Sequence, residues 1–412
     1  MSEKSKIIDH DIYLSGPVNI VRLEGKVDNI KKVIYLFFDY HIFSTECKSV
    51  DSIDVHKYFI KFFESLSKDK SEKIFDFFVE TFSHDIEKEQ NSDKFRAKNN
   101  YLQNVRKIFS NLIKITTKNK IHSPDKYKNV RLHFTDIRDL IYKNNAMDPS
   151  NHTVDAIYDH SYNMKCSNFS VENYKKTLIN LENTQKNSFD IINSFENSNS
   201  KFKLDKSIVG VVEDRTKKFK GSDYDKIINN LFYKMRHEYK NNEISAIMNN
   251  VLSCYFLSGM YSLIQKIKKA TEIMNNNKKM FEHTKNFSHK KLDDTFLSEY
   301  LDNLSNKLSD IGQKDLTTYS ILIDCYMIRR MLDKKYITNC LYYAGAAHTS
   351  NIIYILIKYF NFKMTHCSYN KYDVNEFNDK IKHMTIDDIL ENLVPDEFYQ
   401  CSNLKNFPVN FE

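Results

Sequence analysis

Several features are scarce in this sequence of 412 residues, which has 7 glycines, 5 prolines and no tryptophan. It lacks an uncharged apolar run of about 18 residues, so we expect no membrane-spanning helix. The longest apolar stretch, residues 244–267, is interrupted by Asn249, Asn250 and Gln265 and is typical of a buried helix. The first residues are polar and do not resemble a secretory signal. We therefore expect an intracellular, cytoplasmic protein.

Motifs that would identify a common enzyme or metal class are also absent. The 7 cysteines are scattered and form no C-x-x-C pair, which argues against a zinc ribbon and against a disulfide framework. A reducing compartment fits this cysteine usage best. The chain also lacks H-E-x-x-H, G-x-S-x-G and P-loop motifs, so those hydrolase and nucleotide-binding classes lose support.

What the chain does contain is typical of a folded globular protein. Hydrophobic residues make up 41%, and there are 26 tyrosines and 29 phenylalanines. The formal net charge is +7, from 61 basic and 54 acidic residues. The basic residues are spread along the chain, whereas a nucleic-acid-binding protein usually concentrates them on one face. Lys, Asn and Ile are abundant, which indicates an A/T-rich genome, so part of the positive charge reflects codon composition. For both reasons we do not expect nucleic acid to be a partner.

Strand-like segments lie at both ends of the chain, with a helical region between them. The strand candidates are 18–23, 32–39, 76–81, 129–138, 337–343 and 362–368, with a weaker one at 208–212. Helical spacing is found in 55–63, 101–115, 225–235, 244–267, 316–332 and 386–393. Residues 275–279 (NNNKK) are expected to break or fray the fourth helix. These patterns predict an α/β protein: a mixed sheet core from residues 18–147 and 312–412, a mostly helical insertion or cap at 148–311, and an N-terminal arm at 1–17.

A histidine follows the last central strand. The strand at 337–343 leads into the small residues 344–347, then His348, and then a helix with Thr349 and Ser350 as candidate N-caps. In open α/β sheets, ligands bind beyond the carboxyl ends of the strands. His348 is therefore a candidate site residue, and the alternative is an ordinary turn histidine.

Other strands end in a similar way. The strand at 32–39 ends in Asp39-Tyr40-His41, and the strand at 76–81 carries Glu80. Alternate residues of a strand point to the same side, so Asp39 and His41 could face one ligand. A further candidate strand has His133, Asp136 and Arg138 near its end, where Asp136 and Arg138 could simply pair. We expect His41, Glu80 and His348 to converge on one pocket, with Asp39 and Arg330 at its edge.

Two imidazoles and a carboxylate suit a divalent metal such as Mn, Co or Zn. In this interpretation His41, Glu80 and His348 are the ligands, Asp39 is a fourth ligand or a base, and the metal activates a bound water. Without a metal the same groups could act as general acid and base. Arg329 and Arg330 precede the His348 strand. One of them could clamp an anion at the site, and the alternative is a solvated helix face.

The order of these motifs resembles the Tiki/TraB and erythromycin-esterase/ChaN group of α/β proteins. The group's first strand ends in G-x-x-H, matched by Phe38-Asp39-Tyr40-His41 without the glycine. Its second strand ends in a glutamate, as in Val79-Glu80-Thr81. An arginine-bearing helix matches Arg329-Arg330-Met331, and the last G-x-x-H is Gly345-Ala346-Ala347-His348. Residues 148–310 have no counterpart in the group.

This resemblance implies a hydrolase whose substrate is a peptide, an ester or another small molecule. The Tiki branch consists of metal-dependent proteases, and the esterase branch uses a histidine without metal. The composition and the large insertion also resemble uncharacterised proteins of large cytoplasmic DNA viruses. The competing hypothesis is a non-catalytic structural or interaction protein, such as a virion component or an inactive relative, for which we expect a stable oligomer.

Overall fold

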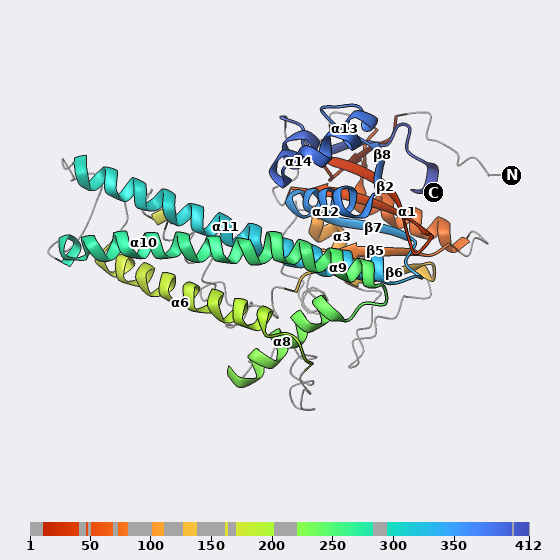
Figure 1. Cartoon of the computed structure of the whole chain (residues 1–412). Helices are drawn as coiled ribbons and strands as arrows, with labels where there is room; N and C mark the ends of the chain where they lie inside the picture. Colours follow the sequence, from red (N-terminus) through yellow and green to blue (C-terminus); the bar gives the residue numbers. More distant parts are fainter. Residues whose placement is uncertain are drawn as a thin grey trace. The chain divides into compact units, whose positions relative to one another are not determined.

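The computed structural model describes residues 11–40, 47, 51–68, 73–80, 101–110, 127–137, 161–163, 170–201, 221–282, 295–397 and 399–411. The chain divides into two compact units (Figure 1). Unit 1 comprises Met1–Asp136 and Tyr326–Glu412, and unit 2 comprises Ile137–Cys325. Unit 2 is thus inserted in sequence between the two segments of unit 1, close to the expected helical insertion at 148–311.

Unit 1 is built on a six-stranded mixed sheet, which confirms the predicted α/β class. The strand order is β6 (Val130–Phe134), β5 (Phe75–Val79), β7 (Asn339–Gly345), β3 (Ile30–Asp39), β2 (Asn19–Val27) and β8 (Lys363–Cys367). The first four strands are parallel, whereas β2 and β8 join in antiparallel fashion. The carboxyl ends of β6, β5, β7 and β3 therefore meet along one side of the sheet, which we call the carboxyl edge.

Strands β2 and β3 form a hairpin that is longer than the sequence pattern indicated. Asp28 and Asn29 have φ of 50° and 61°, as a two-residue hairpin turn requires. The predicted end of the first strand at residue 23 is too early, because Gly25 still pairs with Lys32 inside the hairpin. A Cβ at Gly25 would lie 2.5 Å from the ring of Phe362. The glycine thus admits an aromatic ring against the strand rather than a turn.

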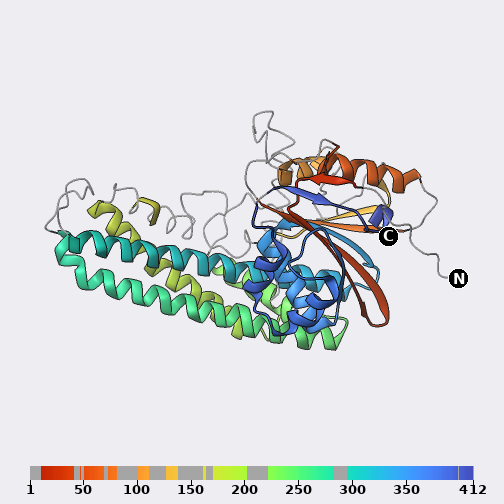
Figure 2. The same ribbon diagram turned by 90° about the horizontal axis from the view of Figure 1, so that it is seen from above.

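Helices cover both faces of the six-stranded sheet (Figures 1 and 2). Helices α1 (Val55–Lys68) and α3 (Tyr101–Ser110) pack on one face, and α12 (Ala346–Phe360) packs on the other. The α1 face is rich in aromatic rings: Phe59 lies 5.1 Å from Phe37 and 4.9 Å from Phe77, between ring centroids. Burial of such rings supplies most of the driving force for this layer.

A second, three-stranded sheet includes residues from the expected N-terminal arm. It has the order β4 (Ile53–Asp54), β1 (Tyr13–Ser15) and β9 (Cys401–Asn403). Leu14 of β1 is fully buried, because β1 is paired on both sides. Within unit 1, β1 therefore links the C-terminal strand β9 to β4.

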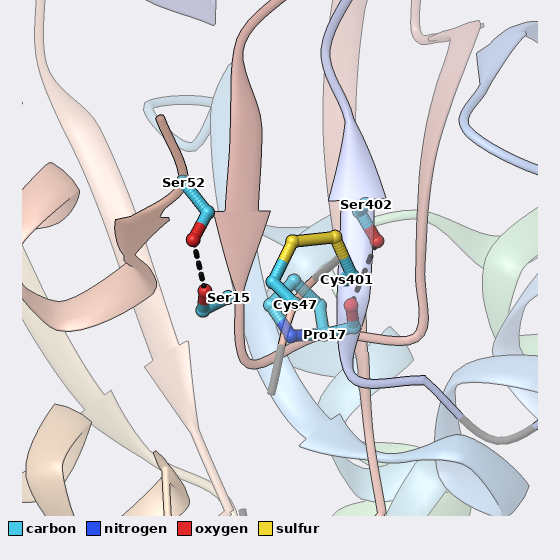
Figure 3. Close-up of a disulfide and its surroundings, with 6 residues drawn as sticks. All are labelled: Ser15, Pro17, Cys47, Ser52, Cys401 and Ser402. Atoms are coloured by element: carbon cyan, nitrogen blue, oxygen red, sulfur yellow. Dashed lines mark hydrogen bonds between the residues drawn. A yellow bond between two sulfur atoms is a disulfide. The ribbon is translucent and has the colours of Figure 1, made fainter. Parts of the chain in front are cut away.

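Cys47 and Cys401 form a disulfide beside β1 and β9 (Figure 3), with 5.1 Å between their Cα atoms. Around it, Ser402 donates a hydrogen bond to the carbonyl of Pro17 at 2.8 Å and Ser15 donates to Ser52 at 3.0 Å. The expectation of reduced cysteines is wrong for this pair. The two residues are 354 positions apart, and strand pairing rather than sequence spacing brings them together. Among the described cysteines, the free ones are Cys254, Cys325, Cys340 and Cys367.

Unit 2 is helical. Its elements are α6 (Val171–Glu196), α8 (Gly221–His237), α9 (Asn242–Val251), η3 (Leu252–Leu257), α10 (Ser258–Glu282) and most of α11 (Thr295–Asp333). The expected break at 275–279 is wrong, because Met274 is buried among α6 and α11 residues and α10 continues. Helix α11 also begins well before the predicted 316. The candidate strand at 208–212 lies outside the described residues.

The C-terminal part of unit 1 contains α13 (Val374–Lys380), η5 (Ile381–His383), α14 (Ile386–Leu393) and η6 (Val409–Phe411). Helix α14 has the predicted bounds because Thr385 and Asp388 form a reciprocal capping box at its start. Asn378 of α13 closes the outer edge of β8: its side chain accepts from the N–H of Met364 and donates to the carbonyl of the same residue, both at 2.8 Å.

Candidate functional site

Helix α12 begins directly where β7 ends. Gly345 is the N-cap, and no side chain of its own caps the helix. The prediction that Thr349 or Ser350 caps it is wrong, and His348 lies in the first turn of the helix instead. The reason is a carboxylate from another strand: Glu80 Oε2 accepts a hydrogen bond from the Gly345 N–H at 2.8 Å. Anions are favoured at a helix N-terminus.

Glu80 and His348 form a buried pair at this point. Glu80 Oε1 lies 3.5 Å from His348 Nε2, and the two residues are 4% and 7% exposed. The backbone of Glu80 is held on both sides. Its N–H donates to the Tyr343 carbonyl at 3.1 Å, and its carbonyl accepts from the Arg106 guanidinium at 2.5 Å. The carboxylate is therefore positioned by β5, β7, α3 and α12 together.

Asp39 lies at the same edge but faces the other side of the sheet. It follows Phe37 in strand alternation and so points to the α1 face, whereas Glu80 follows Phe78 and points to the α12 face. Asp39 Oδ1 accepts a hydrogen bond from the Tyr343 hydroxyl at 2.8 Å. Burial, together with the Asp39 carboxylate, raises the pKa of Tyr343 well above its usual range. Asp39 is thus paired with a tyrosine that sequence reasoning did not single out.

His41, the other predicted histidine of the site, lies outside the described residues. The part of the chain that the structure describes brings together two of the three predicted ligands, Glu80 and His348. Within that part, no group of three or more His, Cys, Asp or Glu side chains is arranged to hold a metal ion.

The two donors nevertheless have a spacing that suits a shared metal. Two ligand atoms about 2.1 Å from a tetrahedral ion lie about 3.4 Å apart. Glu80 Oε1 and His348 Nε2 are 3.5 Å apart, and the hydrogen bond from Gly345 would orient the carboxylate from behind. Both donors therefore fit two positions of a metal site, and the predicted third ligand, His41, lies outside the described residues.

Arg330, one of the two arginines expected to clamp an anion, forms its hydrogen bonds with β6 instead. Arg330 donates to the Phe134 carbonyl at 2.6 Å and to His133 Nδ1 at 2.9 Å, at the end of β6. Arg329 is 4% exposed, so the alternative of a solvated helix face does not describe it either. Arg330 is therefore a support for the edge strand β6.

His133 belongs to a polar cluster on β5 and β6. Its Nε2 lies 2.7 Å from Asp76 Oδ1, and Arg131 donates to Asp76 Oδ2 at 2.6 Å. Arginine can only donate, so His133 Nδ1 must accept from Arg330 and Nε2 must carry the proton. The expected pairing of Asp136 with Arg138 is not visible, because Arg138 lies outside the described residues. This cluster satisfies its own hydrogen bonds and is structural.

The fold and the pair define the class: an α/β protein with a mainly parallel central sheet and a Glu–His pair at its carboxyl edge. The chain belongs to the Family of unknown function (DUF5847), whose model matches residues 12–412. It is 32% identical over 437 residues to "Uncharacterized protein R706" of Acanthamoeba polyphaga mimivirus, covering 100% of both chains. It is 29% identical to "Uncharacterized protein R161" of the same virus, covering 97% of this chain and 98% of that one.

These relatives support the expected origin in a large DNA virus, and their descriptions name no activity. The resemblance to the Tiki/TraB and erythromycin-esterase/ChaN group receives no support from them and stays a hypothesis. No solved structure matches the chain. Among the described helices, none is long and apolar enough to cross a membrane.

Proposed function

We propose that this protein is a hydrolase of the Tiki/erythromycin-esterase-like type that works through Glu80 and His348. The observation that carries the proposal is the 3.5 Å approach of Glu80 Oε1 to His348 Nε2 at the carboxyl edge, where open α/β sheets bind their ligands. The order of the strand-end motifs in the sequence supports the same class.

The chemistry follows from three groups. The Glu80 carboxylate stabilises the imidazolium form of His348, which allows the imidazole to take a proton from an attacking water. The first turn of α12 begins beside Glu80, and the N–H groups in the first turn of a helix have no acceptor one turn earlier. They are suited to stabilise the negative charge that develops on a carbonyl oxygen.

In the metal-dependent version, Glu80 and His348 hold a divalent ion together with His41. The metal would lower the pKa of a bound water and polarise the carbonyl. Gly345 keeps its role in either version, because its N–H fixes the Glu80 carboxylate. Neither version assigns Arg330 to the chemistry.

The test compares His348→Ala and Glu80→Gln with wild type on panels of ester and peptide substrates. We expect each substitution to lower the rate by about 10²- to 10⁴-fold, with the fold retained by circular dichroism. His383→Ala removes an exposed histidine of η5 and is the matched control that should keep full activity.

Elemental analysis after exposure to Mn, Co and Zn separates the two versions. Metal in wild type that is lost in His348→Ala supports the metallohydrolase. Activity from metal-free wild type leaves the acid–base version. Wild type that hydrolyses nothing on either panel, with or without metal, would refute the proposal.

A non-catalytic structural or interaction role is the second candidate, and two observations favour it. Glu80 and His348 are both nearly buried. Phe38, which aligns with the glycine of the first G-x-x-H motif of the Tiki/TraB group, is a buried β3 residue paired with Asn19. A scaffold should elute as a stable oligomer from a sizing column and should be indifferent to His348→Ala.

A further inference from the structure

A second feature of the carboxyl edge is a cavity of about 390 Å³ beside Tyr40, the residue directly after β3. Its apolar wall consists of the Tyr40 ring with Leu390, Val394 and Pro395 around the end of α14. Its charged rim consists of Lys371, Glu391 and Asp396. This volume falls in the range of small-ligand sites and is large enough for a long side chain.

The walls of this cavity are fixed in advance by the buried residue Asn19. Its side-chain amide donates to the carbonyls of Tyr369 at 2.8 Å and Leu393 at 2.7 Å, and its oxygen accepts from the Tyr369 N–H at 3.0 Å. Asn19 thus ties the loop before Lys371 and the end of α14 to β2. On the other side, Gln400 donates to the Tyr40 carbonyl at 3.0 Å. A preformed cavity avoids the entropic cost of ordering its walls on binding.

The charges of the rim favour a cation. Lys371 Nζ lies 3.6 Å from Asp396 Oδ1, so these two charges offset each other. Glu391 has no ion-pair partner among the described residues, and it leaves the rim with one negative charge in excess. The Tyr40 ring adds an aromatic face on which a cation could rest. An aliphatic stem ending in a positive charge matches both the apolar wall and the rim.

The cavity lies on the same side of the sheet as the Glu–His pair. Tyr40 and Glu80 both point to the α12 face by strand alternation. Strand β7 separates their strands, so they are offset by two strand spacings of about 4.8 Å and by two residues along the strand, roughly 12 Å in all. An extended peptide advances about 3.3 Å per residue, so a residue bound at Tyr40 would place a bond about three or four residues away near Glu80 and His348.

We propose that this cavity binds the lysine or arginine side chain of a peptide substrate. The assignment to a substrate rests on the proposed hydrolase function, whereas binding of the side chain does not. The stem packs on Leu390, Val394 and the Tyr40 ring, and the charged head meets Glu391.

The binding experiment uses the full chain with Nα-acetyl-arginine amide and its uncharged isostere, Nα-acetyl-citrulline amide. Because the chain has no tryptophan, Tyr40→Trp creates a single fluorescent reporter that keeps an aromatic wall. Ligand-observed NMR on wild type gives an independent measurement if the reporter does not fold. We expect the arginine amide to bind roughly five- to tenfold more tightly than the citrulline amide.

Glu391→Gln should bring the two affinities together by weakening only arginine binding. Asp379→Asn is the matched control, because it removes one exposed carboxylate of α13 that does not line this cavity, and it should change neither affinity. Equal affinities in wild type, no binding of either ligand, or an unchanged ratio in Glu391→Gln would overturn the proposal.

The experiments distinguish failure of the cavity proposal from failure of the hydrolase proposal. Selective arginine binding without cleavage of any peptide would refute the hydrolase and keep the cavity. Cleavage that is indifferent to arginine, lysine or citrulline at every position would keep the hydrolase and refute the cavity.

Discussion

At the scale of single residues, His133 is an imidazole whose charge state is set by its neighbours. Burial lowers its pKa below the usual 6.5; the hydrogen bond to Asp76 opposes this, and the Arg330 guanidinium adds to the lowering. The hydrogen-bond pattern agrees with this direction, because Nδ1 accepts from Arg330 and only Nε2, which donates to Asp76, is left to carry a proton.

This residue predicts a pH dependence of stability. The folded pKa lies below the unfolded one, so the unfolded chain takes up the proton first as the pH falls. Stability is therefore full above about pH 6.5 and falls below it, by at most about 1.4 kcal/mol per pH unit for one group. His133→Gln should flatten this loss between about pH 7.5 and about pH 5, measured by urea unfolding. An unchanged slope would contradict the assignment, since His56 and His366, whose pKa values burial also lowers, stay in both proteins.

At the scale of elements, Lys32 of β3 closes the end of α11. Its ammonium donates to the carbonyls of Met331 and Lys334 at 3.0 Å and of Ile337 at 2.6 Å, and the residue is 1% exposed. The last carbonyls of a helix have no partner within it, so this buried cation satisfies groups that would otherwise be stranded between α11 and β7. Burial lowers the pKa of Lys32, and the three acceptors hold the charge in place.

Lys32→Met should lower the free energy of unfolding by about 2–4 kcal/mol, because three charge-assisted hydrogen bonds are lost and their carbonyls stay buried. Lys31→Met is the matched control. That side chain is 59% exposed and pairs with Glu24 at 2.8 Å, so its loss should cost less than about 1 kcal/mol. Chemical denaturation of the two variants checks the difference, and equal costs would refute the capping role.

At the scale of the whole molecule, the Cys47–Cys401 disulfide closes a loop of nearly the entire chain, with 354 positions between its ends. A cross-link of this span restricts the unfolded chain and is worth about 6 kcal/mol in the chain-entropy model, against about 2–4 kcal/mol for a typical disulfide. We expect Cys401→Ser, or a reductant, to lower the melting temperature. Cys254→Ser, which removes an exposed free thiol, should leave it unchanged.

Peptide mapping under non-reducing conditions provides the direct check. It should recover a linked fragment that contains Cys47 and Cys401. Free thiols at both positions in protein purified without reductant would contradict the pairing.

Local pattern in the sequence was sufficient for the classes of element and for part of the site. Burial on two faces leaves a continuous apolar run, so β3, β5 and β7 could be recognised, and the polar residues at their ends identified Glu80 and His348. The hairpin turn at Asp28 and Asn29, the start of α12 and the length of α11 were missed. Tertiary contacts account for two of these differences: Phe362 packs on Gly25 in the hairpin, and Glu80 accepts from Gly345 at the start of α12.

The tertiary structure alone decided which distant residues contact each other. Arg330 bonds β6 rather than the Glu–His pair, Asp39 bonds Tyr343 on the opposite face, and Cys47 meets Cys401. Periodicity reports which side of an element is buried, but it carries no information on which distant element lies there. The sequence by itself therefore determined an α/β protein with charged groups at its strand ends, and the strand order determined which of those groups meet, because only pairing brings residues hundreds of positions apart within hydrogen-bond distance.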